Sequence, residues 1–246
     1  MASQQFSDSA KLWLEHSENR SFDPSGSDFL GPVASRMATS DPTYFAIYCA
    51  RYKFVARLLS GFKQVAEVGC GDGFGTSFLS KAAGNVEAFD IDSDMLQSCR
   101  SRMSQVPNLE FTEHDFVLSS LPRGESQFDA LVMVDVIEHI HAEEEDSFLR
   151  NSVALLRDSG IAIIGTPNIF ASEWASENSR LTHVNLKSVD SLRASLSRYF
   201  DRVLIMGQND EVIHTGFHGM CHYLWAVCFG SIGRANRPEQ RRIDVK

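Results

Sequence analysis

The chain has 246 residues, of which 43% are hydrophobic and 10% aromatic, so it can bury a substantial core and is not a disordered segment. Its 23 Lys and Arg against 32 Asp and Glu give a formal charge of −9, and such an acidic chain repels a phosphate backbone. No apolar run approaches the ~20 residues that cross a bilayer. Five scattered cysteines form neither a disulfide framework nor a Cys-x-x-Cys metal site. Residues 1–17 lack the apolar centre of a signal peptide, so we expect a cytoplasmic protein without membrane contact.

The first 40 residues are polar and are interrupted by prolines and glycines. We expect an N-terminal arm here, with a short helix near Ala10–His16, that orders over a substrate. The first strong element begins at Asp41 and Pro42, a helix cap followed by proline at the first helical position. Apolar residues then recur at helical spacing until Gly61, which suits the C-terminal cap. These residues are Tyr44, Tyr48, Tyr52, Val55 and Leu59.

Short apolar runs alternate with helix-like stretches after this helix. The runs are Val65–Val68, Val86–Phe89, Leu109–Phe111, Ala130–Val134 and Ile161–Ile164. The helix-like stretches are Thr76–Ala83, Ser93–Met103, Glu143–Leu156 and Ser188–Tyr199. This repetition predicts an α/β fold, a doubly wound, Rossmann-like parallel sheet with helices on both faces.

The end of the chain departs from this alternation. Val203–Met206 and Met220–Phe229 are joined by a loop too short for a crossover helix. We therefore expect the two strands to lie antiparallel at the edge of the sheet. Residues 41–230 then form one domain, and the basic residues 231–246 form a solvated tail.

A glycine-rich loop, Glu67–Gly75, closes the first strand and opens a helix. Gly69, Gly71 and Gly73 let the backbone turn tightly and approach a ligand, and the helix N-terminus favours an anionic group. The nicotinamide-dinucleotide pattern would need a further glycine five residues on. Five residues after Gly69, Gly71 and Gly73 the chain has Phe74, Thr76 and Phe78, respectively, so the pattern is not met. A tight turn without a ligand is the alternative.

Acidic residues follow the next two strands. Asp90 ends the second strand, where a carboxylate can accept both hydrogen bonds of a ribose diol. The alternative role of helix cap is better filled by Asp92 or Ser93. After the third strand, Asp115 could accept from an adenine amino group and Phe116 could supply a backbone N–H, although Asp115 also suits an ordinary turn. In a doubly wound fold these strand ends open onto one crevice.

The glycine loop and the spaced acids resemble class I S-adenosylmethionine-dependent methyltransferases, over Tyr44 to Phe229. The resemblance implies a seven-stranded sheet with an antiparallel last strand and S-adenosylmethionine as methyl donor. It places the methionine end at the glycines, the ribose at Asp90 and the adenine at Asp115. The implied cofactor-binding residues are Glu67, Gly69, Cys70, Gly71, Gly73, Asp90, Ile91, Asp115, Phe116 and Asp135. Cys70 is expected to pack rather than to act as a nucleophile.

The run Asp135–Ile140 follows the fourth strand, next to the expected position of the sulfonium. The Asp/Asn-Pro-Pro-aromatic motif of many amino methyltransferases is absent. A hydroxyl acceptor must be aligned and must lose its proton, and His139 is the natural base, with Glu138 orienting it or the substrate. The alternative is that these residues only cap the helix that begins at Glu143.

This run, together with Thr166-Pro167-Asn168, resembles two groups of O-methyltransferases. One group contains the ubiquinone-biosynthesis enzymes, and the other the small-RNA terminal 2′-O-methyltransferases, which hold a divalent metal through Glu-x-x-Glu-His and a later histidine. Here Asp135 replaces the first Glu, and His183 would be the later histidine. Because no tight ligand spacing is met, a divalent metal is allowed but not favoured.

A third resemblance is to bacterial methyltransferases of surface-polysaccharide or secondary-metabolite pathways. It rests on Ala171–Ser176, His183–Asn185, Asn209–Glu211 and His214–Phe217, and implies a sugar-like or small hydroxylated acceptor. We expect Phe170–Lys187, which contains Trp174, to form a lid insertion together with the arm 1–40. An ordinary surface loop is the alternative.

The predicted function is methyl transfer from S-adenosylmethionine to a hydroxyl of a small molecule. The candidate catalytic residues are His139, Glu138, His183 and His214, whereas His222 is expected to pack in the terminal hairpin. N-methylation of a small amine and a non-catalytic cofactor-binding subunit are the alternatives. RNA 2′-O-methylation, and nucleic acid as a partner, are disfavoured by the charge of −9. A homodimer is compatible with the sequence.

Overall fold

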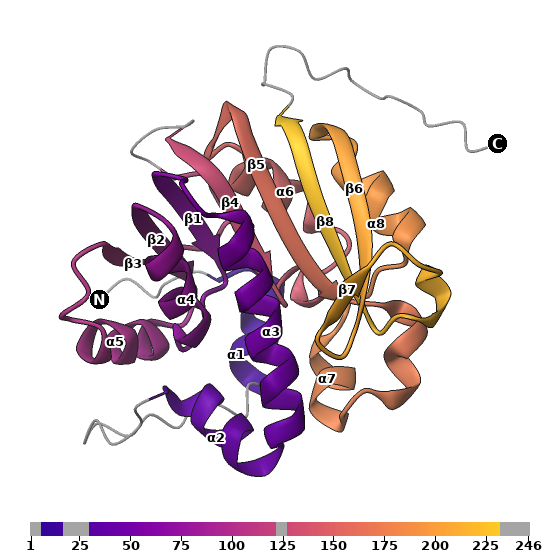
Figure 1. The fold of residues 1–246 in the computed structure, drawn as a ribbon, viewed down its shortest axis with the longest axis horizontal. Coiled ribbons are helices and arrows are strands. Elements are labelled where there is room, and N and C mark those ends of the chain that lie inside the picture. The colour runs from indigo at the N-terminus through magenta and orange to yellow at the C-terminus, as the bar shows by residue number, and fades with distance from the viewer. Residues whose placement is uncertain (1–5, 17–29, 122–126, 232–246) are drawn as a thin grey trace.

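The structure is a computed structural model, and it describes residues 6–16, 30–121 and 127–231. Its strands are β1 (Gln64–Val68), β2 (Asn85–Asp90), β3 (Leu109–Glu113), β4 (Phe128–Val134), β5 (Leu156–Pro167), β6 (Phe200–Asn209), β7 (Val212–His214) and β8 (Tyr223–Ser231). They form one sheet in the order β3-β2-β1-β4-β5-β8-β6-β7 (Figure 1). The pairs from β3 to β5 are all parallel, which confirms the predicted doubly wound α/β fold.

The C-terminal strands differ in part from the expectation. β8 and β6 pair antiparallel as predicted, but β8 lies inside the sheet, between β5 and β6, rather than at its edge. In the described part of the chain, the sheet also has eight strands instead of the expected seven, because β7 turns back and pairs with the end of β6. Asp210, at a φ of +49°, makes this tight turn. A three-residue strand is too short to show in the hydrophobic pattern.

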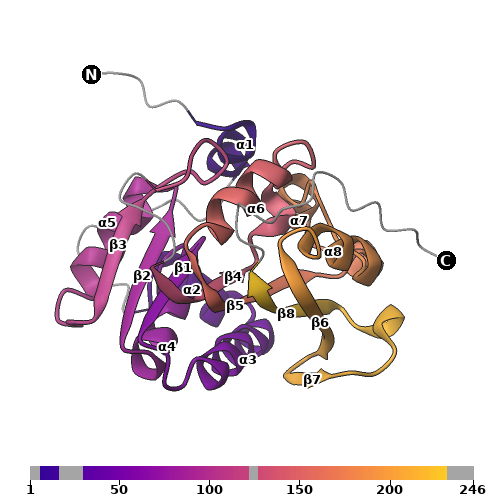
Figure 2. The same cartoon turned by 90° about the horizontal axis from the view of Figure 1, so that it is seen from above.

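Helices cover both faces of the sheet (Figure 2). They are α1 (Asp8–His16), α2 (Pro32–Ser40), α3 (Pro42–Leu58), α4 (Phe74–Ala82), α5 (Ser93–Arg102), α6 (Glu145–Val153), α7 (Glu177–Thr182) and α8 (Val189–Leu196), with 3-10 helices η1 (Ile137–His139), η2 (Ile169–Trp174) and η3 (His218–Met220). The predicted start of α3 is confirmed, since the Asp41 carboxylate accepts the backbone N–H of Tyr44 at 2.9 Å. The short helix expected near Ala10–His16 is α1.

Three apolar clusters among the described residues hold the helices to the sheet, the smallest of them between α5 and the strands β2 and β3. On one face Val65 and Val86 pack with Tyr52 of α3, and on the other Ala66 and Val68 belong to the core that includes α6 and α8. The alternation of side chains along each strand separates the two sets. The sheet is therefore buried on both faces, and the carboxyl ends of its parallel strands remain the place for a ligand.

Three short helices surround these carboxyl ends. α1, α2 and α7 lie together at one end of the sheet, below the strands in Figure 1. The described parts of the expected arm are α1 and α2, and residues 17–29 lie outside the described residues, as does the tail after Ser231. Within the described residues, every helix is too short or too polar to traverse a bilayer.

Candidate cofactor and acceptor site

A cavity of about 300 Å³ opens at the carboxyl ends of β1, β2 and β4. Ten of the residues singled out from the sequence line it: Gly69, Cys70, Gly71, Asp90, Ile91, Asp115, Asp135, Glu138, His139 and His183. Residues from α1, α2, α3 and α7 complete its walls. The structure thus brings the glycine loop, the spaced acids and the run after the fourth strand into one site.

The three glycines of the loop all have positive φ angles, but they serve different purposes. A Cβ on Gly69 would overlap Val136, and one on Gly73 would lie 2.5 Å from Met103 Cε, so both glycines permit close packing. Gly71, at a φ of +54°, has no described atom within 4 Å of such a Cβ and borders the cavity. Gly71 is therefore the position that leaves room for a ligand, while Gly73 does not line the cavity.

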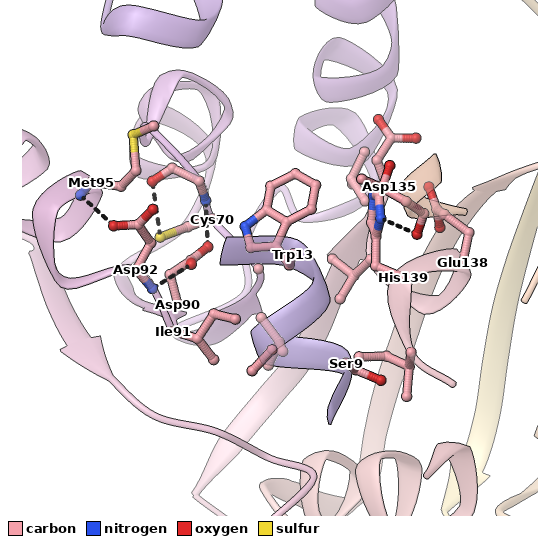
Figure 3. A pocket seen from close by; sticks show the side chains of 18 of the residues that line it. Ser9, Trp13, Cys70, Asp90, Ile91, Asp92, Met95, Asp135, Glu138 and His139 are labelled. Carbon is pink, nitrogen blue, oxygen red and sulfur yellow. Dashed lines mark hydrogen bonds between the residues drawn. The ribbon is translucent and has the colours of Figure 1, made fainter. Parts of the chain in front are cut away.

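Asp90 is held by the loop that it faces (Figure 3). Its carboxylate accepts the N–H of Gly71 at 2.8 Å and that of Asp92 at 3.0 Å, and burial raises its pKa. Asp92 caps α5 by accepting the N–H groups of Asp94 and Met95, as the sequence predicts. Asp90 is thereby left to face the cavity rather than to cap a helix.

Asp115 lies at the far end of the cavity from the fourth strand. Its Oδ1 accepts the N–H of Val117 at 2.9 Å, and its Oδ2 accepts the N–H of Ser7, just before α1, at 3.1 Å. The neighbouring Phe116 does not line the cavity, because its ring is buried in the core against Phe89. Each carboxylate oxygen has a second lone pair, so Asp115 can still accept from an adenine amino group.

Two further residues assigned to the cofactor are buried and uncharged. Glu67 does not line the cavity, and burial raises its pKa to about 8 beside Thr76 and Tyr52. Burial also raises the pKa of the Cys70 thiol well above its ordinary value. Cys70 is therefore a neutral thiol in the cavity wall, in agreement with the packing role expected of it.

Asp135 begins the acceptor end of the cavity and is paired with a buried arginine. Its Oδ2 lies 2.7 Å from Nη1 of Arg51 in α3, and the Arg51 guanidinium lies 3.8 Å from the centre of the Tyr223 ring. Asp135 has a φ of +57°, a conformation that is uncommon for a residue other than glycine. The charge of Asp135 is thus compensated within the protein.

Glu138 and His139 follow on η1, and each is oriented by one hydrogen bond. Thr166 Oγ1 donates to Glu138 Oε2 at 2.9 Å, and burial together with the charge of Asp135 raises the pKa of Glu138 to about 8. His139 Nδ1 lies 3.0 Å from the Thr182 carbonyl oxygen, so it carries the proton and leaves Nε2 as an acceptor. Burial and the neighbouring His183 lower the pKa of His139 to about 3, which keeps its ring neutral.

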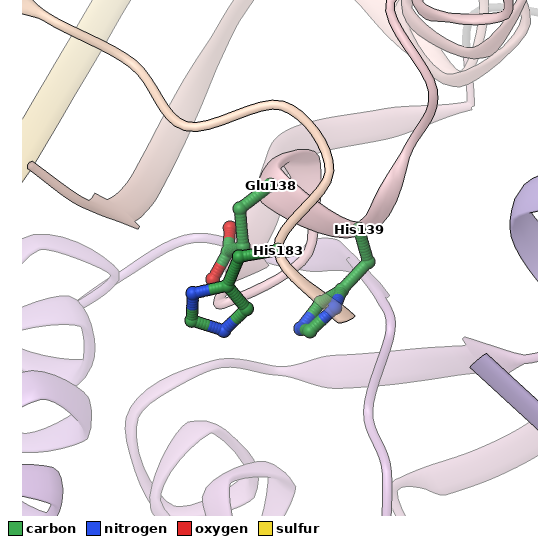
Figure 4. A group of neighbouring side chains, drawn as sticks. All are labelled: Glu138, His139 and His183. Atoms are coloured by element: carbon green, nitrogen blue, oxygen red, sulfur yellow. The ribbon is translucent and has the colours of Figure 1, made fainter. Parts of the chain in front are cut away.

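The same end of the cavity contains a group that could hold a metal (Figure 4). Glu138, His139 and His183 each offer one donor atom, and these atoms all lie within 4.8 Å of one another. Two imidazoles and a carboxylate suit a divalent transition metal. Asp135, the further ligand considered from the sequence, is not in the group and is paired with Arg51.

Comparison with known proteins agrees with this geometry. Residues 65–160 match a family model described as a methyltransferase domain. A probable S-adenosylmethionine-dependent methyltransferase of Mycobacterium tuberculosis (strain ATCC 25618 / H37Rv) is 32% identical over 106 residues, which are 43% of this chain and 36% of that protein. The matched stretch is a class I S-adenosylmethionine-dependent methyltransferase domain.

Two more distant relatives extend the comparison. A ubiquinone biosynthesis O-methyltransferase of Actinobacillus pleuropneumoniae serotype 7 (strain AP76) is 26% identical over 110 residues, covering 43% of this chain and 46% of that protein. The chain therefore spans less than half the length of these curated relatives. The N-methyltransferase NodS from Bradyrhizobium japonicum WM9, solved with S-adenosyl-L-homocysteine, matches 89% of this chain and 98% of its own with a TM-score of 0.62 at 14% identity, which shows the shared fold.

The methyltransferase domain confirms S-adenosylmethionine as the predicted methyl donor. The cavity fits this cofactor, since Gly71 leaves open space next to Asp90 and the Asp115 carboxylate lines the same cavity. One residue next to the cavity was not indicated by sequence patterns. Arg51 does not line the cavity but pairs with Asp135, which does, and its only signal was a charged residue among the apolar positions of a predicted helix.

α1, the short helix expected in the N-terminal arm, forms part of the cavity wall. Ser7, Ser9, Ala10 and Trp13 line the cavity, and the Trp13 ring lies edge-on to His139 with 4.5 Å between ring centres. Of the expected lid insertion, Ser179 and His183 reach the cavity, but Trp174 does not line it and is 76% exposed. The tryptophan beside His139 is thus Trp13 of α1 rather than Trp174.

His214, a candidate acceptor contact, does not reach the site. Its Nε2 lies 2.7 Å from Asn209 Oδ1, and its Nδ1 accepts the N–H of Gly216 at 3.0 Å. These bonds keep the ring within the β6–β7 hairpin, away from the cavity lining. The expectation for His214 is therefore wrong, because β7 pairs at the outer edge of the sheet.

Proposed function

We propose that this chain transfers a methyl group from S-adenosylmethionine to a hydroxyl oxygen of a small molecule, sugar-like or a secondary metabolite. The observation that supports an oxygen acceptor most directly is the His139 ring. It is neutral, and the Thr182 carbonyl fixes the tautomer that leaves Nε2 free to accept a proton in the cavity. The similarity to a ubiquinone biosynthesis O-methyltransferase supports the same class of acceptor.

When bound, S-adenosylmethionine supplies an electrophilic methyl group on a cationic sulfonium. The open space at Gly71 admits the cofactor, and Asp90 accepts hydrogen bonds from its ribose hydroxyls. Asp115 accepts from the adenine amino group at the far end of the cavity. The chain thereby fixes the direction from which an acceptor oxygen must approach.

His139 completes the reaction by accepting the hydroxyl proton on Nε2. A hydroxyl oxygen becomes strongly acidic as it bonds to the methyl carbon, so a weakly basic imidazole is sufficient at that stage. The bond from Nδ1 to Thr182 keeps the ring aligned throughout. Glu138, protonated at neutral pH and held by Thr166, borders the same space and orients the acceptor.

Two substitutions separate cofactor binding from proton removal. We expect Asp90→Ala to raise the dissociation constant for S-adenosyl-L-homocysteine at least tenfold by calorimetry. His139→Ala should leave that constant within about twofold but lower turnover by about 10² to 10⁴, the range of general-base catalysis. Turnover is measured as S-adenosyl-L-homocysteine release with a panel of sugars, phenols and amines.

His218→Ala is the matched control, since this histidine lies on η3 and does not line the cavity. It should change neither binding nor turnover. If Asp90→Ala keeps binding while His139→Ala loses it, the assigned roles are wrong. Transfer to amines alone would overturn the oxygen acceptor.

A further inference from the structure

The N-terminus of α1 is fastened to the segment that follows η1. The Glu144 carboxylate accepts the N–H of Asp8 on Oε1 and the N–H of Ser9 on Oε2, both at 3.0 Å. The Ser9 hydroxyl donates to the same carboxylate and accepts the N–H of His141 at 2.6 Å. A carboxylate at this place satisfies free N–H groups of the first helical turn and interacts favourably with the positive end of the helix dipole.

The position of α1 matters because the helix touches both ends of the cavity. At the adenine end, the backbone of Ser7 donates to Asp115. At the acceptor end, Trp13 packs edge-on against His139. Figure 3 shows Trp13 between the Asp90 group and the group of Asp135 and His139. A helix of nine residues is marginal on its own in water, so its place depends on such contacts.

We propose that Glu144 is a positioning residue that holds α1 closed over the cavity and thereby sets Trp13 against His139. The inference rests on the proposed function and adds to it a residue that contacts neither cofactor nor acceptor. With α1 in place, Trp13 and His139 together bound the acceptor position and exclude water from it. With α1 released, Asp115 loses the bond from Ser7 and the cavity opens for exchange of the cofactor product.

The test compares Glu144→Gln and Ser9→Ala with the neighbouring variant Glu143→Gln. Glutamine keeps the size of Glu144 but offers one acceptor oxygen instead of two, and Ser9→Ala removes the hydroxyl that joins Glu144 to His141. Glu143 is exposed and is the matched control. Hydrogen exchange of residues 8–16 is measured in each protein, together with the dissociation rate of S-adenosyl-L-homocysteine by stopped-flow fluorescence.

We expect Glu144→Gln and Ser9→Ala to raise both hydrogen exchange of α1 and the dissociation rate at least tenfold, with far-ultraviolet circular dichroism unchanged. The value of kcat should change by a larger factor than KM, because α1 sets the geometry of the bound complex. Glu143→Gln should match the wild type. Unchanged exchange of α1 would show that Glu144 does not hold the helix, and faster exchange with an unchanged dissociation rate would show that α1 does not close the cavity.

These outcomes are distinct from a failure of the proposed function. If the wild type does not bind S-adenosyl-L-homocysteine, the proposed function fails, while hydrogen exchange still decides whether Glu144 holds α1. If transfer occurs to an amine instead of a hydroxyl, the dissociation rates still decide whether α1 closes the cavity. A global loss of structure in Glu144→Gln is recognised by circular dichroism, and Ser9→Ala then provides the decisive comparison.

Discussion

The open space at Gly71 allows a substitution whose effects on folding and on binding should separate. Gly71 has a φ of +54°, and no described heavy atom beyond Gly71 and its two chain neighbours lies within 4 Å of a Cβ built on it. In Gly71→Ala the new methyl group meets no clash, so the cost to folding is the strain of a left-handed backbone. That strain amounts to roughly 1–2 kcal/mol for a residue other than glycine.

Binding should suffer more than folding in Gly71→Ala. The methyl group would stand in the part of the cavity wall that faces the cofactor, next to the N–H that Gly71 donates to Asp90. We expect the dissociation constant for S-adenosyl-L-homocysteine to rise at least tenfold, which corresponds to a loss of about 1.4 kcal/mol or more. Calorimetry gives this constant, and urea unfolding gives the change in stability.

Gly61→Ala supplies the matched control for backbone strain. Gly61 has a φ of +92° and also no described atom within 4 Å of a Cβ, but it lies after α3 and does not line the cavity. Gly61→Ala should therefore cost a similar free energy of unfolding and leave binding unchanged. If Gly71→Ala binds S-adenosyl-L-homocysteine as well as Gly61→Ala does, the cofactor does not occupy the space beside Gly71.

Two other predictions concern the buried Glu67 and the group that could hold a metal. Because burial raises the pKa of Glu67 from 4.5 to about 8, the folded chain keeps its proton over an interval in which the unfolded chain loses it. The free energy of unfolding should therefore fall with rising pH in that interval, by about 1.4 kcal/mol per pH unit relative to Glu67→Gln. Urea unfolding at pH 5, 6.5 and 8 measures this. The same pH dependence of the unfolding free energy in both proteins would contradict the raised pKa. At the acceptor end, burial keeps Glu138 protonated at neutral pH and Arg51 holds Asp135, so neither offers a metal a free carboxylate, and dialysis against EDTA should leave turnover unchanged. Loss of turnover that Mn²⁺ restores would instead assign the three-donor group to a metal.

The parts of the site that sequence patterns predicted are those encoded within a few neighbouring residues. The glycine loop, the cap at Asp92 and the acid at the end of β2 each depend on local backbone geometry and on strand order, and the structure places the loop and Asp90 at one cavity. Strand ends converge in any doubly wound sheet, which is why their spacing predicts a common crevice.

These patterns do not predict contacts between residues that are far apart in the chain. Ser9 and Glu144 are 135 residues apart, and Arg51 and Asp135 are 84 apart. Neither pair belongs to a repeated spacing, and each forms only once an N-terminal helix, α1 or α3, has packed against the segments that follow β4. The error at His214 has a related cause, since a three-residue strand at the sheet edge is too short for a periodic pattern to reveal it.

The acid-base chemistry of the acceptor end emerges only when these long-range pairs are considered together. The sequence predicts His139 as the base, Glu138 as a residue that orients it or the substrate, and Asp135 as a cofactor-binding residue. In the folded chain Arg51 neutralises Asp135, and burial beside Asp135 raises the pKa of Glu138 to about 8, so neither provides a free carboxylate at neutral pH. His139 keeps an unprotonated Nε2 because its Nδ1–H donates a hydrogen bond to the Thr182 carbonyl oxygen. This arrangement supports the proposal that His139, rather than either carboxyl group, accepts the hydroxyl proton.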